Sequence, residues 1–430
     1  MNPLRTCLRL VLVGLVCLLA GGPAASGLAH QSDQANGRSP RGPKQIVDDD
    51  GDPSTDGYYA DEAIVQLRKR LTIEAFDQRH GTSLIAAIPP RNLYLVRLPD
   101  GADPTQLERE MEADPASIWV ELNFTNQAPE GRPGYFFTSR GEGDEATAPY
   151  GPALVGADRA QRCSSGAGVV VAVLDTGVDP SHPLLQGRVL AGWNALDDSG
   201  DTTDAGNGID DNGNGDTDEM TGHGTHVAGI VAQIAPDAAI LPVKVLDSDG
   251  VGDAFFLAAG IYYALDQGAR VINLSLGSTY DARVVQEAVG VAANAGAVVV
   301  AAAGNADRDQ PREYPAADRG AVAVAATDDA DRKSSFSNYG PVVALSAPGT
   351  RISSAFVGGT DATWSGTSMA APFVSGGAAL VITQHPELTG AAVVSRLRTT
   401  AADLDDLNPD YAGELGSGRL DLAAAVACDG

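Results

Sequence analysis

Three side chains in the sequence have the types that acyl-transfer chemistry requires. Asp175 follows an apolar run, and His223 and Ser368 each stand at the start of a helical pattern. An alcohol is a poor nucleophile at neutral pH unless a base takes its proton, and the pKa of imidazole suits that task. A carboxylate can fix the tautomer of the imidazole and stabilise its charged form. Each residue alone could equally be a turn, packing or capping residue, but the combination favours a catalytic group.

Elements that could position these side chains alternate along residues 150–430. Fully apolar strands between amphipathic helices are typical of a parallel α/β sheet covered on both faces. Ligands of such sheets bind beyond the carboxyl ends of the strands, where Asp175 stands. The predicted strands are Val169–Leu174, Ile240–Leu246, Val271–Leu276, Ala297–Ala302 and Ala321–Ala326, and the predicted helices are His223–Ile234, Ala254–Asp266, Ala282–Ala295 and Ser368–Gln384.

A shorter pattern occupies residues 58–122. Four strands and two helices follow each other in the order β-α-β-β-α-β, which predicts a small α+β sandwich. Asp103 and Pro104 stand where the N-cap and first residue of the second helix are expected. The strands are Ala63–Leu67, Leu84–Ile88, Leu93–Leu98 and Ile118–Leu122, and the helices are Thr72–His80 and Asp103–Ala113.

The motifs around the three polar residues resemble those of the subtilisin-like serine peptidases (peptidase S8). The resemblance covers residues 150–428. It is carried by Asp-Thr-Gly at 175–177, His-Gly-Thr-His-Val-Ala-Gly at 223–229, Gly-Thr-Ser-Met-Ala-Ala-Pro at 366–372, and the stretches 271–277, 300–305 and 335–349. It implies a three-layer, subtilisin-like α/β fold with a mainly parallel central sheet.

The same resemblance implies a serine endopeptidase that forms an acyl-enzyme at Ser368, with Asp175 and His223 completing the triad. The chain order Asp, His, Ser is that of subtilisin, whereas an esterase of the α/β-hydrolase type would carry Gly-x-Ser-x-Gly and the order Ser, Asp, His. A catalytically silent member that binds other proteins is the other alternative, and the complete triad argues against it.

Further residues gain roles from the resemblance. Asn305 matches the family's oxyanion asparagine, which stabilises the tetrahedral intermediate. Ser275, Leu276 and Gly277 resemble the edge segment that pairs with the substrate backbone, a mode that favours broad specificity. Glu313 aligns with the floor of the S1 pocket, which holds the residue before the scissile bond. A carboxylate there would favour Lys or Arg, and the alternative is an exposed loop acid.

An acidic insert at 197–219 lies between Asp175 and His223. Part of it matches a calcium loop, in which oxygen ligands alternate and a glycine makes the turn. The candidate calcium ligands are Asp210, Asn212, Asn214, Asp216 and Asp218, with Gly215 at the turn. Thr221 stands where an EF-hand carries its bidentate Glu, so the match is partial, and a solvated acidic loop is the alternative. The ion would be structural, and the chemistry needs no cofactor.

The ends of the chain indicate export and processing. Residues 1–29 have a positive start, an apolar run and small residues, as in a cleaved signal peptide, and a retained anchor is the alternative. Residues 30–57 are predicted to be a disordered leader, and 123–149 a linker with the processing site. The 58–122 domain resembles the inhibitor I9-like propeptides, which implies an intramolecular inhibitor and folding aid that the enzyme cuts off. After export, Cys163 and Cys428 could form a disulfide or remain two thiols.

The overall charge excludes one class of partner. The net charge is −27, from 56 acidic and 29 basic residues, whereas a nucleic-acid binder needs a basic surface. We therefore expect protein or peptide substrates, no nucleic acid, no membrane association once the signal is removed, and a secreted monomer, extracellular or periplasmic.

Overall fold

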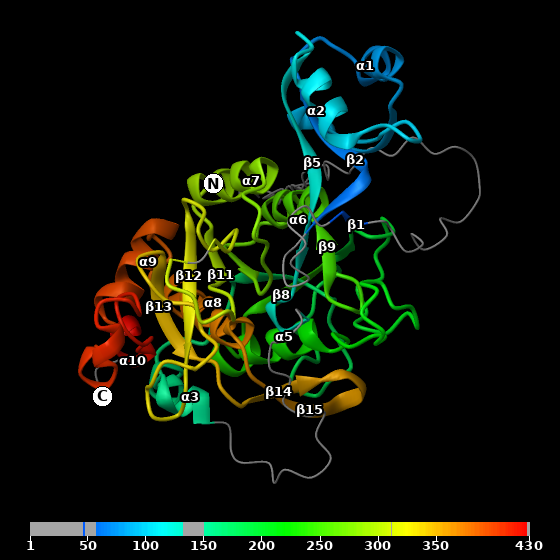
Figure 1. Cartoon of the computed structure of the whole chain (residues 1–430). Coiled ribbons are helices and arrows are strands. Elements are labelled where there is room, and N and C mark those ends of the chain that lie inside the picture. Colours follow the sequence, from blue (N-terminus) through cyan, green and yellow to red (C-terminus); the bar gives the residue numbers. More distant parts are fainter. Residues whose placement is uncertain (1–45, 48–56, 132–149, 311, 428–430) are drawn as a thin grey trace, which may run out of the picture.

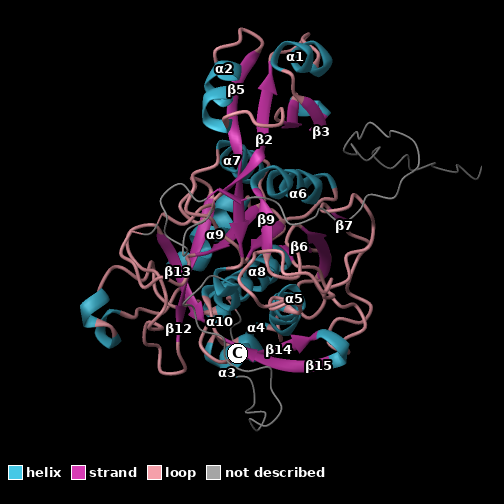
Figure 2. Cartoon of the chain, turned by 45° about the vertical axis from the view of Figure 1, so that its right-hand side comes forward, coloured by secondary structure: helices cyan, strands magenta, loops and turns pink. Residues whose placement is uncertain are grey.

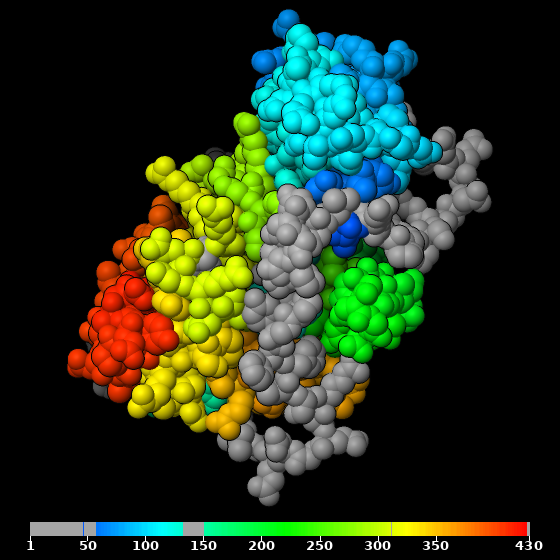
Figure 3. Space-filling view, viewed as in Figure 1, coloured from blue at the N-terminus to red at the C-terminus, as the bar shows by residue number. Residues whose placement is uncertain are grey.

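The computed structural model describes residues 46–47, 57–131, 150–310 and 312–427. This part forms an N-terminal unit and a larger unit, each with its own sheet. The N-terminal unit stands above helices α6 (Ala254–Asp266) and α7 (Arg283–Asn294) (Figure 1) and forms a lobe on the larger unit (Figure 3). Within the described ranges, no helix combines the length and apolarity needed to cross a bilayer. The predicted signal peptide at 1–29 lies outside the described residues.

The sheet of the N-terminal unit has the strand order β3-β4-β2-β5, with β1 paired to β2, and the larger unit adds β9 (Val251–Asp253) beside β5. Its neighbouring strands are antiparallel. The order of strands and helices in the chain agrees with the predicted β-α-β-β-α-β. The elements are β1 (Ile46–Val47), β2 (Tyr58–Leu67), α1 (Ile73–His80), β3 (Ser83–Ile88), β4 (Leu93–Arg97), α2 (Pro104–Glu112) and β5 (Ser117–Gln127).

Alternation along β2 explains how this sheet is covered. Ala63 and Val65 pack with Phe76 of α1 and Met111 of α2 in a small core, because side chains two apart on a strand share a face. Ile64 points to the other face and belongs to the core of the larger unit. Figure 2 shows α1 and α2 at the far end of the N-terminal unit, away from α6 and α7. One face of the small sheet is therefore buried by the larger unit.

The larger unit is a three-layer α/β structure. Its sheet has the order β13-β12-β11-β10-β6-β8-β7, and all neighbouring strands are parallel, as predicted. Helices α6 and α7 cover the face towards the N-terminal unit, and α5 and α8 cover the other (Figure 1). The remaining elements are α3 (Tyr150–Leu154), α4 (Ala157–Ala160), β6 (Val170–Asp175), β7 (Trp193–Asn194), α5 (His223–Ile234), β8 (Ala239–Lys244), β9 (Val251–Asp253), β10 (Val271–Leu274), β11 (Val298–Ala302), β12 (Ala321–Thr327), β13 (Val343–Pro348), β14 (Ile352–Phe356), β15 (Thr360–Trp364), α8 (Thr367–Gln384), α9 (Gly390–Thr399) and α10 (Leu422–Val426).

Strand β5 holds the two units together through the ends of two helices. The two carboxylate oxygens of Glu121 each accept a backbone N–H from the first turn of α7, both at 2.8 Å. The amide oxygen of Asn123 accepts the N–H of Phe255 in α6 at 3.2 Å. Free N–H groups at a helix start favour such acceptors. Burial raises the pKa of Glu121 to about 7, although both N–H donors oppose that shift.

The structure differs from the predicted linker at its start. Residues 123–127 continue β5, and Thr125–Gln127 pair antiparallel with β9. Composition indicated an exposed linker because residues 129–145 are rich in proline, glycine and acids, but Asn123, Thr125 and Asn126 at its start are buried at the interface. Residues 132–149 lie outside the described residues. Cys163 is disulfide-bonded, and Cys428 also lies outside the described residues.

Candidate functional site

Asp175 ends β6 at the carboxyl edge of the parallel sheet. Its side chain is fully buried, and its Oδ1 accepts the N–H of Thr176 at 2.8 Å. The Nδ1 atom of His223, the first residue of α5, lies 2.7 Å from the same oxygen. Helix α5 can approach this closely because Gly224 has no side chain: a Cβ there would lie 2.2 Å from the carbonyl oxygen of Gly177.

Asp204, from the acidic insert, binds residues next to Asp175 and residues next to His223. One carboxylate oxygen accepts the N–H of Gly222 at 2.9 Å and the hydroxyl of Thr176 at 3.1 Å. The other accepts the N–H and the hydroxyl of Thr225 at 3.0 and 2.7 Å. Gly222 has no side chain to cap α5, so Asp204 takes that role from a distant loop. Asp204 was not predicted from the sequence, because nothing distinguishes it from the neighbouring acids.

Ser368 lies in the first turn of α8 and is fully buried. Pro372, four residues later, has no N–H to donate to the Ser368 carbonyl. The hydroxyl of Ser275 donates to that carbonyl instead, at 2.8 Å, and Asn273 Nδ2 in turn donates to Ser275 at 2.9 Å. Ser275 thus supports the start of α8 with its side chain.

Asn305 follows β11, and its amide is oriented by Thr367. The N–H and hydroxyl of Thr367 both donate to Asn305 Oδ1, at 2.9 and 2.8 Å. The oxygen is therefore occupied and Nδ2 points into the site. Thr367 was not singled out from the sequence, although it belongs to the motif that contains Ser368.

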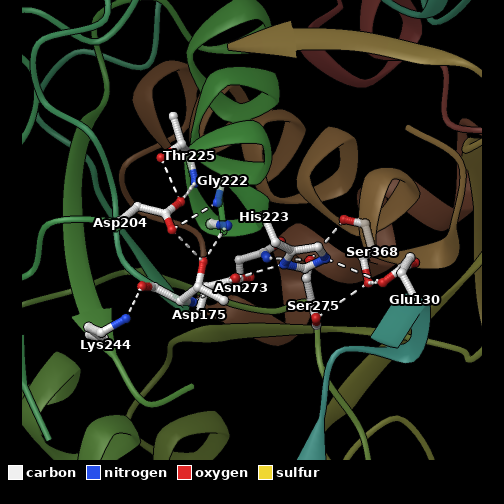
Figure 4. A network of polar contacts seen from close by, with 12 residues as sticks. Glu130, Asp175, Asp204, Gly222, His223, Thr225, Lys244, Asn273, Ser275 and Ser368 are labelled. Carbon is white, nitrogen blue, oxygen red and sulfur yellow. Dashed lines mark hydrogen bonds and ion pairs between the residues drawn. The ribbon is translucent and has the colours of Figure 1, made fainter. Parts of the chain in front are cut away.

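A further residue, Glu130, contacts Ser368, His223 and Asn305 at the same time. Its Oε2 accepts the hydroxyl of Ser368 at 2.6 Å and lies 3.3 Å from His223 Nε2. Its Oε1 accepts Asn305 Nδ2 at 2.8 Å. Figure 4 shows His223, Ser368 and Glu130 in one continuous network with Asp175 and Asp204. The structure thus brings Asp175, His223, Ser368 and Asn305 together, with a carboxylate of the same chain between the last three.

Charge explains the protonation of this network. Burial alone would lower the pKa of His223, but the carboxylates of Asp175 and Glu130 raise it to about 10. Burial alone would raise the pKa of Glu130, because it disfavours the charged carboxylate. The interaction with His223, and after it the hydrogen bonds from Ser368 and Asn305, instead hold the pKa of Glu130 below its usual range. At neutral pH the buried group is therefore an imidazolium between two carboxylates.

The segment predicted to pair with substrate is paired with the chain itself. Gln127 and Gly277 exchange two backbone hydrogen bonds, each of 2.9 Å, and the N–H of Ala128 donates to the carbonyl of Gly250 at 2.9 Å. Leu276 is buried. Residues 125–128 thus lie between β9 and the 275–277 segment, as an added strand would.

Glu313 is buried, with 3% of its surface exposed, so it is not an exposed loop acid. Its carboxylate lies against two glycines. A Cβ on Gly277 would be 2.0 Å from one carboxylate oxygen, and a Cβ on Gly304 would be 2.8 Å from the other. The carboxylate therefore lies beside the 275–277 segment and beside the residue that precedes Asn305.

The predicted calcium ligands lie in one loop, but their oxygens mostly accept backbone N–H groups. Asp210 accepts from three residues and Asp218 from two, and Asp216 is exposed. The amides of Asn212 and Asn214 both meet Glu219 Oε1, at 2.7 and 2.6 Å. Glu219 Oε2 is buried and has no partner among the described residues. Within the described ranges no cluster of three or more His, Cys, Asp or Glu is arranged for a metal.

Comparison with known proteins identifies the family. The sequence profile of the Subtilase family matches residues 166–418. Thermitase of Thermoactinomyces vulgaris is 47% identical over 245 residues, which are 55% of this chain and 82% of thermitase. Subtilisin DY of Bacillus licheniformis is 37% identical over 273 residues, which are 60% of this chain and 93% of that protein.

A solved structure agrees with these relatives. The crystal structure of fervidolysin from Fervidobacterium pennivorans, a keratinolytic enzyme related to subtilisin, has a TM-score of 0.71 at 26% identity. The match covers 89% of this chain and 62% of that chain, so this chain spans less than two thirds of fervidolysin. The predicted resemblance to the subtilisin-like serine peptidases and the predicted three-layer α/β fold are confirmed. The chain therefore belongs to the subtilase family of serine-type endopeptidases.

Proposed function

We propose that this chain is the precursor of a secreted serine endopeptidase that cleaves proteins through an acyl-enzyme at Ser368. The observation that carries this function is the convergence of Ser368 Oγ and His223 Nε2 on one carboxylate oxygen, with Asp175 on the other nitrogen of the ring. Serine and imidazole therefore already face a common acceptor, which is where a substrate carbonyl would stand.

The proposed steps follow from these positions once a peptide replaces Glu130. His223 Nε2 takes the proton of Ser368 as its oxygen attacks the carbonyl carbon, and Asp175 stabilises the resulting imidazolium. Asn305 Nδ2 and the Ser368 N–H donate to the negatively charged oxygen. His223 then gives its proton to the leaving amine. Water, deprotonated by the same imidazole, hydrolyses the ester and restores the serine.

The N-terminal unit would act as the intramolecular inhibitor, with residues 1–29 as signal peptide, 30–57 as leader, 58–122 as propeptide domain and 150–430 as catalytic domain. Two features support this. Residues 125–128 occupy the strand position of a substrate, and Glu121 and Asn123 cap helices of the larger unit. Processing would fall within the predicted linker, 123–149.

Glu313 would select Lys or Arg before the scissile bond. Its buried carboxylate next to Gly277 and Gly304 supports this, because a buried anion gains most from a cationic partner. The backbone pairing at 275–277 asks little of the other substrate residues, so specificity would rest mainly on this pocket.

A structural calcium ion in the acidic insert is part of the proposal. The buried Oε2 of Glu219, beside Asn212 and Asn214, fits an oxygen-liganded cation, since amide and carboxylate oxygens are the ligands calcium prefers. Glu219 would join the predicted ligands Asp210, Asn212, Asn214, Asp216 and Asp218 around the ion. The oxygens of Asp210 and Asp218 also accept backbone N–H groups of the insert. The ion would neutralise the insert that supplies Asp204.

Fluorophosphonate labelling tests the enzymatic proposal. The mature wild-type protein should label at one residue and digest casein, while Ser368→Ala should do neither. The Ser368→Ala chain should also remain at full length during expression. A mutant that still matures alone would show that another protease performs the processing, and a wild-type protein that does not label would contradict the acyl-enzyme.

A further inference from the structure

The described part of the N-terminal segment ends in a turn that directs a side chain, rather than a peptide bond, at Ser368. After Ala128 the chain makes one 3₁₀ turn, Pro129–Gly131, closed by the N–H of Gly131 donating to the Ala128 carbonyl at 3.0 Å. Pro129 has no N–H with which to continue the strand pairing. The turn leaves Glu130 facing inward with 4% of its surface exposed.

The site into which Glu130 reaches is built from three separate elements. Asn305 follows β11, Ser368 opens α8 and His223 opens α5, and each contributes one donor to the carboxylate. Gly366 makes room for it, because a Cβ at this position would lie 1.7 Å from Glu130 Oε1. Charge-assisted bonds of this kind are among the stronger hydrogen bonds in proteins.

A carboxylate in this position blocks the reaction in two ways. It resembles the acid product of peptide hydrolysis and is a poor acyl donor, because its negative charge opposes attack by the serine and no amine can leave. It also requires protonated His223, because both ring nitrogens face carboxylate oxygens. A protonated imidazole cannot take the serine proton, so the triad is held without its base.

We propose that Asn305, Ser368 and His223 form a carboxylate-binding site, and that the Glu130 side chain fills it in the precursor as a built-in product mimic. This inference rests on the proposed function. It goes further by assigning the blockade to one side chain, in addition to the strand pairing of residues 125–128. The same site would accept free carboxylates once Glu130 is removed.

The test measures how fast a fluorophosphonate labels Ser368 in the full-length chain, read at the full-length mass. Glu130→Ala should label at least about tenfold faster than wild type, which corresponds to the loss of one charge-assisted bond. Glu130→Gln, which keeps the shape without the charge, should also label faster than wild type. Glu112→Ala, at an exposed position of α2, is the control and should match wild type. Thermal midpoints show whether the variants remain folded.

Acetate provides a direct test of the site, because it replaces the carboxylate and adjoining carbon that Glu130→Ala removes. Acetate should slow labelling of Glu130→Ala at constant ionic strength, while acetamide should not, and neither should change the wild type. Equal labelling of wild type, Glu130→Ala and Glu130→Gln would overturn the role of Glu130 and leave the proposed protease intact. Faster labelling that acetate does not reverse would overturn the carboxylate site. Labelling no greater than that of Ser368→Ala in every variant would overturn the proposed function itself.

Discussion

Replacing Asp204 by Ala tests whether the acidic insert positions the catalytic pair. The substitution removes the acceptor of four hydrogen bonds from Gly222, Thr225 and Thr176. The two hydroxyls can turn towards other acceptors, but the two backbone N–H groups are fixed in the first turn of α5. Because a buried donor without a partner costs about 1–3 kcal/mol, the variant should lose about 2–6 kcal/mol of unfolding free energy.

Activity should fall together with stability. Thr176 adjoins Asp175, and Gly222 adjoins His223, so the loss of Asp204 loosens both ends of the 2.7 Å contact between Asp175 and His223. A displacement of about 1 Å in a catalytic group can cost about 100-fold in rate. We therefore expect kcat to fall about 10- to 100-fold while KM changes little, because the 275–277 edge does not contact Asp204.

The assay is peptide hydrolysis by the mature enzyme, with active sites counted by fluorophosphonate titration so that unfolded protein does not enter kcat. Asp204→Asn keeps one oxygen and should lie between wild type and Asp204→Ala. Asp201→Ala is the matched control, since Asp201 is an exposed acid in the same loop. If Asp204→Ala has the thermal midpoint and kcat of Asp201→Ala, Asp204 does not position the catalytic pair.

Four further predictions concern other parts of the site. Thr367→Val should lower kcat about tenfold at constant KM, because Asn305 loses the hydroxyl that orients it; an unchanged kcat would contradict this. Glu313→Gly should reduce the preference for Arg over Leu substrates about 10- to 100-fold, and an unaltered ratio of kcat/KM would rule out the S1 assignment. EGTA should lower the thermal midpoint of the mature enzyme, and equal midpoints with and without calcium would exclude a structural ion. The rate at which a fluorophosphonate labels the precursor should increase from pH 7 to 10, because His223 in the precursor loses its proton only near pH 10. Glu130→Gln should move this increase to lower pH. Identical pH profiles of the two proteins would contradict an ion pair between Glu130 and His223.

The direction of that pH effect follows from linkage. The pKa of His223 is raised in the precursor, where Glu130 contacts Ser368 and His223. The pairing of His223 with Asp175 and Glu130 therefore stabilises this state fully below about pH 6.5, and the stabilisation is lost as the pH rises towards 10. Glu130 has a lowered pKa, so its contribution is present above its ordinary value and is lost as the pH falls through the lowered one. The pairing is therefore strongest between these limits.

The fold and the triad could be predicted because their signals are local. Apolar strands and helical patterns predict the parallel sheet, and the geometry of such a sheet brings Asp175 to the edge that His223 and Ser368 approach. The burial of Glu313 could not be decided from the sequence, since an acid in a loop is ordinarily exposed. Its position depends on how closely its loop folds back against Gly304 and against Gly277 of another segment.

Glu130 and Asp204 could not be predicted for a related physical reason. Glu130 and Ser368 are separated by 238 positions of sequence. The segment around Glu130 has the composition of a loop, and its polar side chain finds its hydrogen-bond partners in the larger unit. Asp204 is one acid among many in the insert, and only the folded path of that insert brings it to the start of α5. The contact of Glu130 therefore depends on how the two units meet, and the contacts of Asp204 depend on the path of the insert within the larger unit.

Strand β5 pairs with β2 in the small sheet and with β9 in the larger unit. The stability of the small sheet therefore affects how easily a peptide reaches Ser368. Partial melting of the small sheet would loosen β5 and withdraw Glu130 from Ser368, and it would also uncover the part of the larger core that packs against Ile64. Heat or a denaturant could then act as a trigger for peptide entry, at a threshold set by a core of few residues around Phe76 and Met111.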